Sequence, residues 1–327
     1  MSKLVTIYGG SGFVGRYIAL RMAKAGWRVR VAVRRPHEAI FVRPYGVVGQ
    51  VEPIFCNIRD DNSVRQALQG ADAVVNCVGI LAESGKSTFE AIQADGAERI
   101  ARMAATEGVA RMVQISAIGA DAEAASEYAQ TKAMGEAGVL KHMPDAVILR
   151  PSIVFGPEEE FFNRFAGMTR ISPAVPVVGA DTLFQPVYVD DVAHAAEIAV
   201  KGNVAGGIYE LGGPDVESFR ALMHRMLDVI NRRRLVVSVP TFAAKIMAFG
   251  FDTLQSLTFG LVQNGMITRD QVKNLAHDNV VADNAKGFDA FGITPTSMSS
   301  VLSGYLWRFR PSGQYDDIKK SAKNLRT

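Results

Sequence analysis

Residues 4–15 decide the fold, and they read LVTIYGGSGFVG. A β-branched apolar run leads directly into a glycine turn, and the turn opens a helical pattern over Val14–Ala25. The GxxGxxG spacing suits a tight turn, a backbone that approaches a pyrophosphate, and a helix packed closely on its strand. Free N–H groups at the start of that helix would bind the phosphates. We therefore predict a dinucleotide site, with a glycine-rich turn lacking a ligand as the alternative, and place in it Gly9, Ser11, Gly12, Phe13, Val14 and Gly15.

The first half of the chain alternates short β-branched runs with longer helical patterns. Strands are expected at Val5–Tyr8, Arg28–Val33, Val51–Phe55, Ala73–Val78, Arg111–Ser116 and Ala146–Leu149, and helices at Val14–Ala25, Asn62–Gln69, Phe89–Glu107 and Tyr128–His142. Such alternation builds a parallel sheet with helices on both faces, and nearly all-apolar strands are typical of a sheet buried on both sides. The sequence predicts an α/β fold, a Rossmann doubly wound parallel sheet.

The regular alternation of strand and helix patterns stops after Arg150-Pro151. Residues 157–183 are rich in Pro, Gly and Phe, and we expect them to be irregular. Val187–Val200 resumes a strand-to-helix pattern, with Asp190 or Asp191 as the helix cap.

The remainder of the chain predicts a second, smaller unit. Ile208–Leu211 is expected to be one more strand, and the chain from Ser218 onward is mainly helical with loops. We divide the chain into a Rossmann domain, 1–156 plus about 184–215, and a small substrate or docking domain, 157–183 plus 216–327. The polar stretch from Pro311 is either an ordered arm against a partner or a frayed tail.

Composition excludes several classes of function. The 327 residues are 48% hydrophobic and 21% charged, with a net charge of +3, which is typical of a soluble globular protein. No long basic run marks a nucleic-acid surface. The short run Arg232-Arg233-Arg234 is expected to be a solvated helix end, with a patch for acidic lipid or protein as the alternative. Cys56 and Cys77 have no ligand-like spacing, so we expect a reducing compartment and no metal site.

The chain carries no obvious membrane span. No run of about twenty uncharged apolar residues exists, because the nearest stretch, Phe242–Val262, contains Lys245 and Asp252. Within it, Phe242–Phe251 is either a buried helix of the small domain or a partly exposed surface for a partner or lipid headgroups. Met1 leads almost directly into a strand, which predicts no targeting peptide and either a cytoplasmic protein of a bacterium or a mature-length chain from elsewhere.

Two arginines follow the second expected strand. In NAD-specific sites an acidic residue near this point accepts hydrogen bonds from the ribose 2′-OH. Here Arg34 and Arg35 stand instead, and a guanidinium matches the 2′-phosphate of NADP in charge and geometry. These residues favour NADP(H) over NAD(H), unless they are only exposed charges after a strand.

A serine, a tyrosine and a lysine complete a candidate catalytic set. Tyr128 and Lys132 are four residues apart, so a helix presents both on one face. A neighbouring ammonium would lower the pKa of the tyrosine, which then exchanges a proton with a substrate hydroxyl or carbonyl. Ser116 ends the fifth expected strand, where it would orient the same substrate oxygen. The alternative is a surface helix pair without chemistry.

Together these residues resemble the short-chain dehydrogenase/reductase superfamily, in its extended or atypical branch. The resemblance covers roughly residues 1–215 and also rests on Asn76–Gly79, on Arg150–Pro157 and on Val187–Val192. It implies that Tyr128 is the acid/base, Lys132 its helper and Ser116 the orienting hydroxyl. It further implies a set of cofactor contacts, with Cys77, Val78, Gly79 and Ile80 on the adenine-ribose side and Pro151, Ser152 and Ile153 near the nicotinamide.

One position departs from that family pattern. An Asp often follows the third strand and contacts the adenine amine, whereas this chain has Asn57, followed by Ile58, with Asp60 a little further on. An amide still hydrogen-bonds adenine, so we include Asn57 and Ile58 among the cofactor contacts.

A narrower resemblance gives two functional readings. Four stretches are similar to the nucleotide-binding accessory subunits of respiratory complex I, NADH:ubiquinone oxidoreductase: Ser116–Lys132, Gly135-Glu136, Ile148–Pro157 and Phe161-Phe162-Asn163-Arg164-Phe165. That resemblance implies a structural NADP(H) off the electron path, other complex I subunits as partners, and a peripheral position on the cytoplasmic side of a bacterial inner membrane. The other reading is a free NADPH-dependent reductase, dehydrogenase or epimerase in the cytoplasm.

Overall fold

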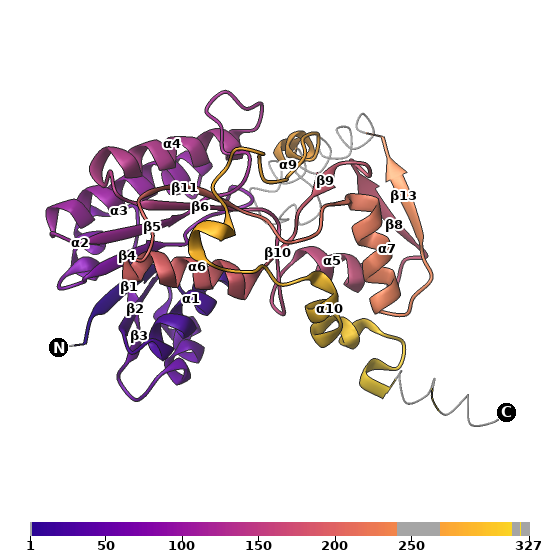
Figure 1. Ribbon diagram of the computed structural model, residues 1–327, viewed down its shortest axis with the longest axis horizontal. Coiled ribbons are helices and arrows are strands. Elements are labelled where there is room, and N and C mark those ends of the chain that lie inside the picture. Colours follow the sequence, from indigo (N-terminus) through magenta and orange to yellow (C-terminus); the bar gives the residue numbers. More distant parts are fainter. Residues whose placement is uncertain (1, 241–268, 316–320, 322–327) are drawn as a thin grey trace.

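The computed structural model describes residues 2–240, 269–315 and 321. Its larger lobe contains a seven-stranded sheet of order β11-β6-β5-β4-β1-β2-β3, in which every pairing is parallel (Figure 1). The predicted Rossmann sheet is therefore confirmed. Its strands are β1 (Leu4–Tyr8), β2 (Arg28–Val33), β3 (Val51–Phe55), β4 (Ala73–Asn76), β5 (Arg111–Ile115), β6 (Val147–Pro151) and β11 (Gly207–Leu211).

The carboxyl edge of this sheet carries the candidate site. β1 lies between β4 and β2, where the direction of strand succession reverses, and ligands bind at such a switch point in open α/β sheets. β4 and β5 end slightly earlier than predicted, so Cys77 and Ser116 leave the sheet at this edge. Pro151 is the last residue of β6, beside β5.

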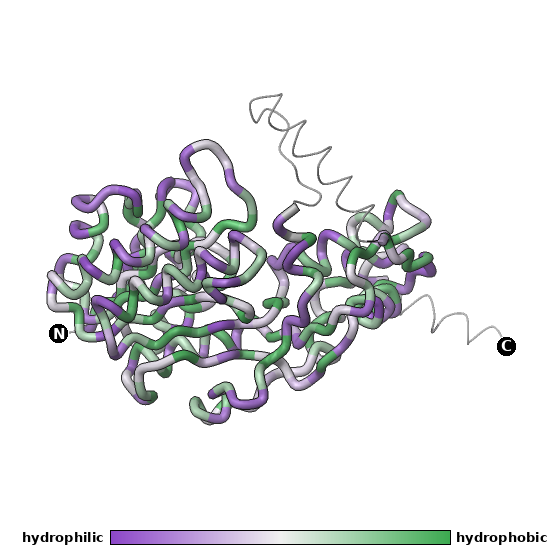
Figure 2. Tube along the Cα trace, turned by 90° about the horizontal axis from the view of Figure 1, so that it is seen from above, coloured by the Kyte–Doolittle hydropathy of each residue, from purple (hydrophilic) through white to green (hydrophobic). Residues whose placement is uncertain are grey.

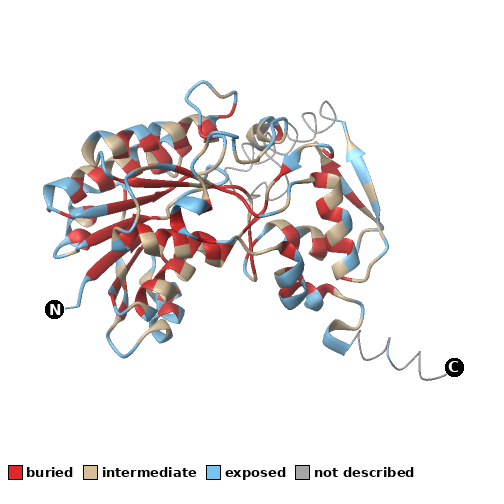
Figure 3. Ribbon diagram, viewed as in Figure 1, coloured by how far each residue is buried: buried red, intermediate tan, exposed pale blue. Residues whose placement is uncertain are grey.

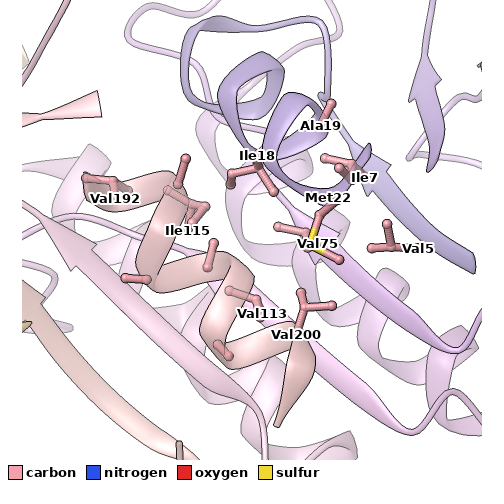
Figure 4. Close-up of a cluster of buried hydrophobic side chains, with 14 of the residues drawn as sticks. Val5, Ile7, Ile18, Ala19, Met22, Val75, Val113, Ile115, Val192 and Val200 are labelled. Atoms are coloured by element: carbon pink, nitrogen blue, oxygen red, sulfur yellow. The ribbon is translucent and has the colours of Figure 1, made fainter. Parts of the chain in front are cut away.

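Helices cover both faces of the sheet. On one face lie α1 (Phe13–Lys24) and α6 (Val189–Lys201), and on the other lie α2 (Asp61–Leu68), α3 (Asp95–Thr106) and α4 (Glu127–His142) (Figure 1). Alternate strand residues divide between the faces. Ile7 belongs to the buried cluster that also contains Ile18 of α1 and Val192 of α6 (Figure 4), whereas Tyr8 belongs to the opposite core and donates its hydroxyl to the carbonyl of Val64. The strands are accordingly buried along most of their length (Figure 3).

The expectation that residues 157–183 are irregular is wrong. This segment contains α5 (Phe161–Met168), β8 (Ala174–Val178) and β9 (Leu183–Phe184), and it follows the short strand β7 (Val154–Phe155). The phenylalanines order it, because Phe161 stacks on Phe219 with ring centroids 5.3 Å apart and Phe162 is fully buried. Their partners lie far along the chain, so local composition did not reveal them.

The expected cap of α6 is also wrong. The N-cap residue is Tyr188, at the end of β10 (Val187–Tyr188), and no side chain caps the helix. Asp190 instead forms a two-pronged ion pair with Arg21 of α1, with both N···O distances 2.7 Å. Asp191 accepts the backbone N–H of Thr296 at 2.6 Å. Both carboxylates therefore tie α6 to other elements.

The smaller lobe has a core of its own. It contains β12 (Glu217–Ser218), α7 (Phe219–Val229), β13 (Leu235–Val239), α9 (Arg269–Asn274) and α10 (Met298–Leu306), and β13 pairs in parallel with β8. Its buried residues come from α5, β8, α7 and α10 (Figure 3). Phe242–Phe251, on which two readings were left open, lies outside the described residues. The described part of the polar C-terminal stretch begins with a short 3-10 helix, Gly313–Tyr315.

Hydrophilic and hydrophobic residues alternate along the described chain in both lobes (Figure 2). Among the helices of the described residues, none is long and apolar enough to cross a membrane.

Candidate cofactor site

The glycine turn has the geometry of a phosphate cradle. Gly9 has φ +71°, a left-handed conformation that favours glycine, and its N–H donates to the carbonyl of Ala32 at 3.0 Å. A Cβ on Gly15 would lie 2.4 Å from the carbonyl oxygen of Gly9, so only glycine lets α1 pack this closely on the turn. Gly12 is the N-cap of α1 without a side-chain cap, and the first turn has no acidic residue. The positive end of α1 is therefore open to an anion.

A cavity of about 490 Å³ begins at this turn and follows the carboxyl ends of β1 to β4. It brings together residues predicted from four separate parts of the sequence: the turn, the end of β2, the segment after β3 and the segment after β4. Those that line it are Gly9, Ser11, Gly12, Arg34, Arg35, Asn57, Ile58, Cys77, Val78, Gly79 and Ile80.

Three arginines line the cavity, and one of them was not predicted. Arg35 forms an exposed ion pair with Glu38 at 3.1 Å, whereas Arg34 has no carboxylate partner among the described residues. Arg59, two residues beyond Asn57, lines the same cavity and donates to the carbonyl of Lys86 at 2.7 Å. Glu38 is the only carboxylate in the lining, so this end of the cavity is positive.

Asn57 and Asp60, which lie three positions apart after β3, have different roles in the structure. Asn57 lines the cavity, whereas Asp60 is the N-cap of α2 and accepts the backbone N–H of Ser63 at 2.7 Å. Asn57 is therefore available to a ligand in the cavity, whereas the carboxylate of Asp60 caps the start of α2. Apart from Arg59 and Glu38, the lining residues that sequence reasoning missed are apolar or small, and no local signal distinguishes them: Ala32, Val33, Cys56, Ser87 and Ile92.

Tyr128 and Lys132 lie on α4 as the four-residue spacing predicted. Lys132 Nζ is 5.8 Å from the centroid of the Tyr128 ring and 3.5 Å from the carbonyl oxygen of Ile115. A Cβ on Gly79 would come within 3.3 Å of Lys132 Nζ, so the lysine lies against a wall of the cavity. Burial lowers the pKa of Lys132 to about 8 and raises the pKa of Tyr128 to about 12. This differs from our expectation that the ammonium lowers the tyrosine pKa, because burial penalises the charged phenolate and raises its pKa.

Ser116 is engaged away from that pair. Its hydroxyl donates to Oε1 of Glu136 at 2.5 Å, and Glu136 is almost fully buried. Arg150 holds the same carboxylate through two nitrogens, at 2.6 and 2.9 Å, and reaches Glu210 at 3.5 Å. A hydroxyl has one proton to donate, so toward a ligand Ser116 presents only its lone pairs. Sequence reasoning missed Glu136 in this role, although its position one helical turn after Lys132 places it on the same face of α4.

A buried amide beside the lysine has no partner. Gln93 is 2% exposed, and neither its amide nitrogen nor its amide oxygen has a hydrogen-bond partner within the described residues. It belongs to a π-helical turn, Glu90–Ala94, that leads into α3, and a Cβ on Gly79 would be 4.0 Å from its Oε1. Buried polar groups are normally paired, so a polar ligand group beside Gly79 and Lys132 fits this amide.

The remaining predicted cofactor contacts do not line the cavity. Phe13, Val14 and Gly15 form the first turn of α1, and Phe13 lies against Gly156, where a Cβ would be 3.2 Å from its ring. Pro151 ends β6, and Ile153 packs against the core of the smaller lobe. Ser152 is buried, and its hydroxyl donates to Oδ1 of Asn279 at 2.7 Å.

The C-terminal part of the chain also reaches the tyrosine. Asp270 of α9 accepts hydrogen bonds from the hydroxyl of Ser126 at 2.7 Å and from the backbone N–H groups of Glu127 and Tyr128. This carboxylate lies at the positive end of α4, where a negative charge is stabilising. The contact spans about half the chain, and no sequence pattern pointed to it.

Comparison with known proteins gives three findings. A family model described as the NAD dependent epimerase/dehydratase family matches residues 5–212. The NADH dehydrogenase [ubiquinone] 1 alpha subcomplex subunit 9, mitochondrial, of Arabidopsis thaliana is 33% identical over 316 residues, which cover 95% of this chain and 79% of that protein. The ceramide reductase of Caulobacter vibrioides is 28% identical over 266 residues, covering 79% and 82% of the two chains.

A solved structure supports the fold. The Bordetella bronchiseptica enzyme WbmH in complex with NAD+ superposes with a TM-score of 0.68, over 96% of this chain and 100% of that chain. The two sequences are 18% identical, so the similarity supports the fold and nothing more specific.

Proposed function

Because the chain belongs to the NAD dependent epimerase/dehydratase family and is homologous to a mitochondrial complex I subunit, we propose that it is an accessory subunit of respiratory complex I. In this proposal it binds NADP(H) as a structural ligand, and the ligand does not lie on the electron path. Such a ligand stabilises the folded protein by mass action, whether or not it ever transfers a hydride.

The extent of the likeness to the Arabidopsis subunit carries this proposal. The family model ends at residue 212, within the larger lobe, but the likeness to the complex I subunit extends over 95% of the chain. A nucleotide fold shared with many enzymes accounts for the first lobe only. Likeness that continues through the smaller lobe favours a shared surface as well as a shared cofactor.

The geometry around Ser116 favours a cofactor that is bound without turnover. A reductase needs a hydroxyl that donates to the substrate oxygen and a tyrosine whose proton transfers readily. Here the Ser116 proton is directed to Glu136, and burial raises the pKa of Tyr128 to about 12. Both features weaken the proton relay while leaving the nucleotide cavity intact.

The residues that would hold the cofactor line the cavity or lie next to its lining residue Gly79. The N–H groups at the start of α1 would bind the pyrophosphate, and Arg34, with Arg35 and Arg59 beside it, would bind a 2′-phosphate. The amide of Gln93 and the ammonium of Lys132 would contact the nicotinamide ribose side. When bound, the group supplies hydride chemistry, which this proposal leaves unused.

The partners and location follow from the same proposal. We infer contacts with other complex I subunits and with the adjacent membrane surface, on the cytoplasmic side of a bacterial inner membrane. A nucleic-acid partner is not part of it.

Gentle purification of the tagged chain from membranes tests the proposal. We expect other complex I subunits to co-purify, and equimolar NADP(H) to be released when the purified chain is denatured. A chain that elutes alone, without complex I subunits, would contradict the subunit role. Release of NAD(H) in place of NADP(H) would contradict the role given to the arginines.

A free NADPH-dependent reductase, dehydrogenase or epimerase is the second candidate. The position of Lys132 Nζ, 5.8 Å from the Tyr128 ring, favours it, as does the likeness to a ceramide reductase. In that case Tyr128→Phe abolishes NADPH turnover with a carbonyl substrate. In the subunit role the same variant leaves complex I assembly and quinone reductase activity unchanged.

A further inference from the structure

A second hollow, of about 350 Å³, lies on the smaller lobe where α7 connects to β13. Arg232, Arg233, Arg234 and His224 line it, with Asp228 as the only carboxylate in the lining. α7 ends at Val229, so the three arginines lie just beyond the helix and not within its last turn. The hollow is far along the chain from the nucleotide cavity and shares no residue with it.

Two more arginines extend this positive surface around a single aromatic ring. The guanidinium carbons of Arg170 and Arg308 lie 5.0 and 5.2 Å from the centroid of Phe309. Arg232 Nε donates to the carbonyl of Phe309 at 2.8 Å. We call the set of Arg170, Arg232, Arg233, Arg234 and Arg308 the arginine face.

The charge of the arginine face is not neutralised within the described residues. Its members bond to backbone carbonyls, to an amide oxygen or to the ring, as when Arg234 Nε donates to the carbonyl of Thr169 at 3.0 Å. None of the five forms an ion pair with a carboxylate in that part of the chain. Burial and the charges of Arg234 and Arg170 lower the pKa of Arg232. A phosphate group would relieve this repulsion and match the guanidinium geometry.

Exposed apolar side chains are interleaved with these arginines. Ile171, Leu235 and Trp307 are 94%, 72% and 39% exposed, and each is adjacent in sequence to a member of the arginine face. Leu235 also lines the hollow. A soluble phosphate would make no favourable contact with these apolar side chains. A lipid surface, in contrast, presents phosphates above an apolar layer that they could enter.

We propose that the arginine face is a docking site for the phosphate groups of anionic phospholipids, with one headgroup in the hollow and Ile171, Leu235 and Trp307 at the acyl boundary. The proposal deepens the peripheral membrane location of the proposed function and rests on it. It assigns that contact to a specific surface of described residues.

Co-sedimentation of the purified full-length protein with vesicles tests the docking site. We expect binding to vesicles of phosphatidylcholine mixed with phosphatidylglycerol, weak binding to phosphatidylcholine alone, and loss of binding at high salt. Arg233→Gln is the variant least expected to disturb the fold. The Arg233 side chain is exposed, and its guanidinium donates no hydrogen bond within the described residues. Removing one positive charge at the membrane surface should weaken vesicle binding about fivefold.

A matched control separates a specific surface from net charge. Lys24→Gln removes the same charge from an exposed position at the end of α1, in the larger lobe, and we expect it to leave vesicle binding unchanged. Leu235→Ser should also weaken binding, because it removes apolar contact without a change of charge. Equal losses in Arg233→Gln and Lys24→Gln would overturn the proposal.

Three further outcomes have defined meanings. Binding of inorganic pyrophosphate at the hollow, detected by shifts of the neighbouring NMR resonances, without binding of anionic vesicles would overturn the lipid and leave a soluble phosphate as the ligand. Co-purification with complex I without vesicle binding would overturn this inference alone. Vesicle binding without complex I subunits would support the docking site and contradict the proposed function.

Discussion

Ser116 Oγ lies 2.5 Å from Oε1 of Glu136 and donates its proton to that carboxylate. Arg150 donates to both oxygens of the same carboxylate, at 2.9 Å to Oε1 and 2.6 Å to Oε2, so the acceptor is fixed in place. The residue that resembles a catalytic serine is therefore part of a buried structural network that joins β5, α4 and β6. Its remaining capacity toward a ligand is that of an acceptor.

This relationship predicts the effect of removing the hydroxyl. Ser116→Ala should lower the free energy of unfolding by about 1.5–3 kcal/mol, the value of a hydrogen bond to a charged group. It should leave the affinity for NADP(H) nearly unchanged. Urea unfolding and calorimetric titration measure the two effects. Ser152→Ala is the matched control, since that buried serine bonds to the neutral Asn279 and should cost less. A large loss of NADP(H) affinity in Ser116→Ala would show that Ser116 serves the cofactor directly.

Gly15 is the glycine of the turn at which an added side chain would cause the most severe clash. In Gly15→Ala the new methyl group would lie 2.4 Å from the carbonyl oxygen of Gly9, so α1 must move away from the turn. We expect a loss of about 1–3 kcal/mol in the free energy of unfolding and a weaker affinity for NADP(H). Gly304→Ala is the control, because no atom lies within 4 Å of its Cβ position on α10. That variant should be neutral or slightly stabilising, and equal behaviour of the two would refute the packing argument.

Arg34 should decide between the two nicotinamide dinucleotides. Arg34→Gln removes a charge-assisted hydrogen bond to the 2′-phosphate, so we expect NADP(H) to bind about 10- to 100-fold more weakly and NAD(H) to bind as before. Calorimetric titration with both nucleotides measures this. Arg43→Gln, which breaks an exposed ion pair with Glu52 on the same lobe, should change neither affinity. A parallel loss for NADP(H) and NAD(H) in Arg34→Gln would remove the basis for NADP preference.

Lys132 should make the stability of the cofactor-stripped protein depend on pH. Its folded pKa, about 8, lies below the ordinary value of 10.5 because burial penalises the charged form. The unfolded chain therefore binds the proton more tightly, and the folded state loses stability as the pH falls from 10.5 through 8. Below pH 8, Lys132→Met should be more stable than the wild type by as much as about 3 kcal/mol, and this advantage should vanish above pH 10.5.

Thermal unfolding across this pH range checks the prediction, and NADP(H) affinity is measured in parallel. Lys141→Met, which replaces an exposed lysine at the other end of α4, should show no such pH dependence. If both variants follow the wild-type pH profile, then burial does not shift the Lys132 pKa. A gain in stability with a loss of affinity would mean that the lysine is retained for its ligand.

Much of the larger lobe could be predicted from the sequence, because its signals are local. Gly9 needs a left-handed backbone, Gly15 needs the absence of a side chain, and several strand runs are nearly all apolar because both faces of the sheet are covered. Each requirement acts within a few residues, so the glycine turn, the strands and the positions of Arg34 and Asn57 after them follow from their order along the chain.

The tertiary structure alone decided which side chains face each other. Ser116 meets Glu136, Asp190 meets Arg21, and Phe161 meets Phe219, and in each case the partners are 20 or more positions apart. Composition and periodicity show which face of a helix or strand is buried. They do not show which residues of another element pack against that face. Thus a serine, a tyrosine and a lysine marked the site in the sequence, while burial and the long-range carboxylate determined what those groups are able to do.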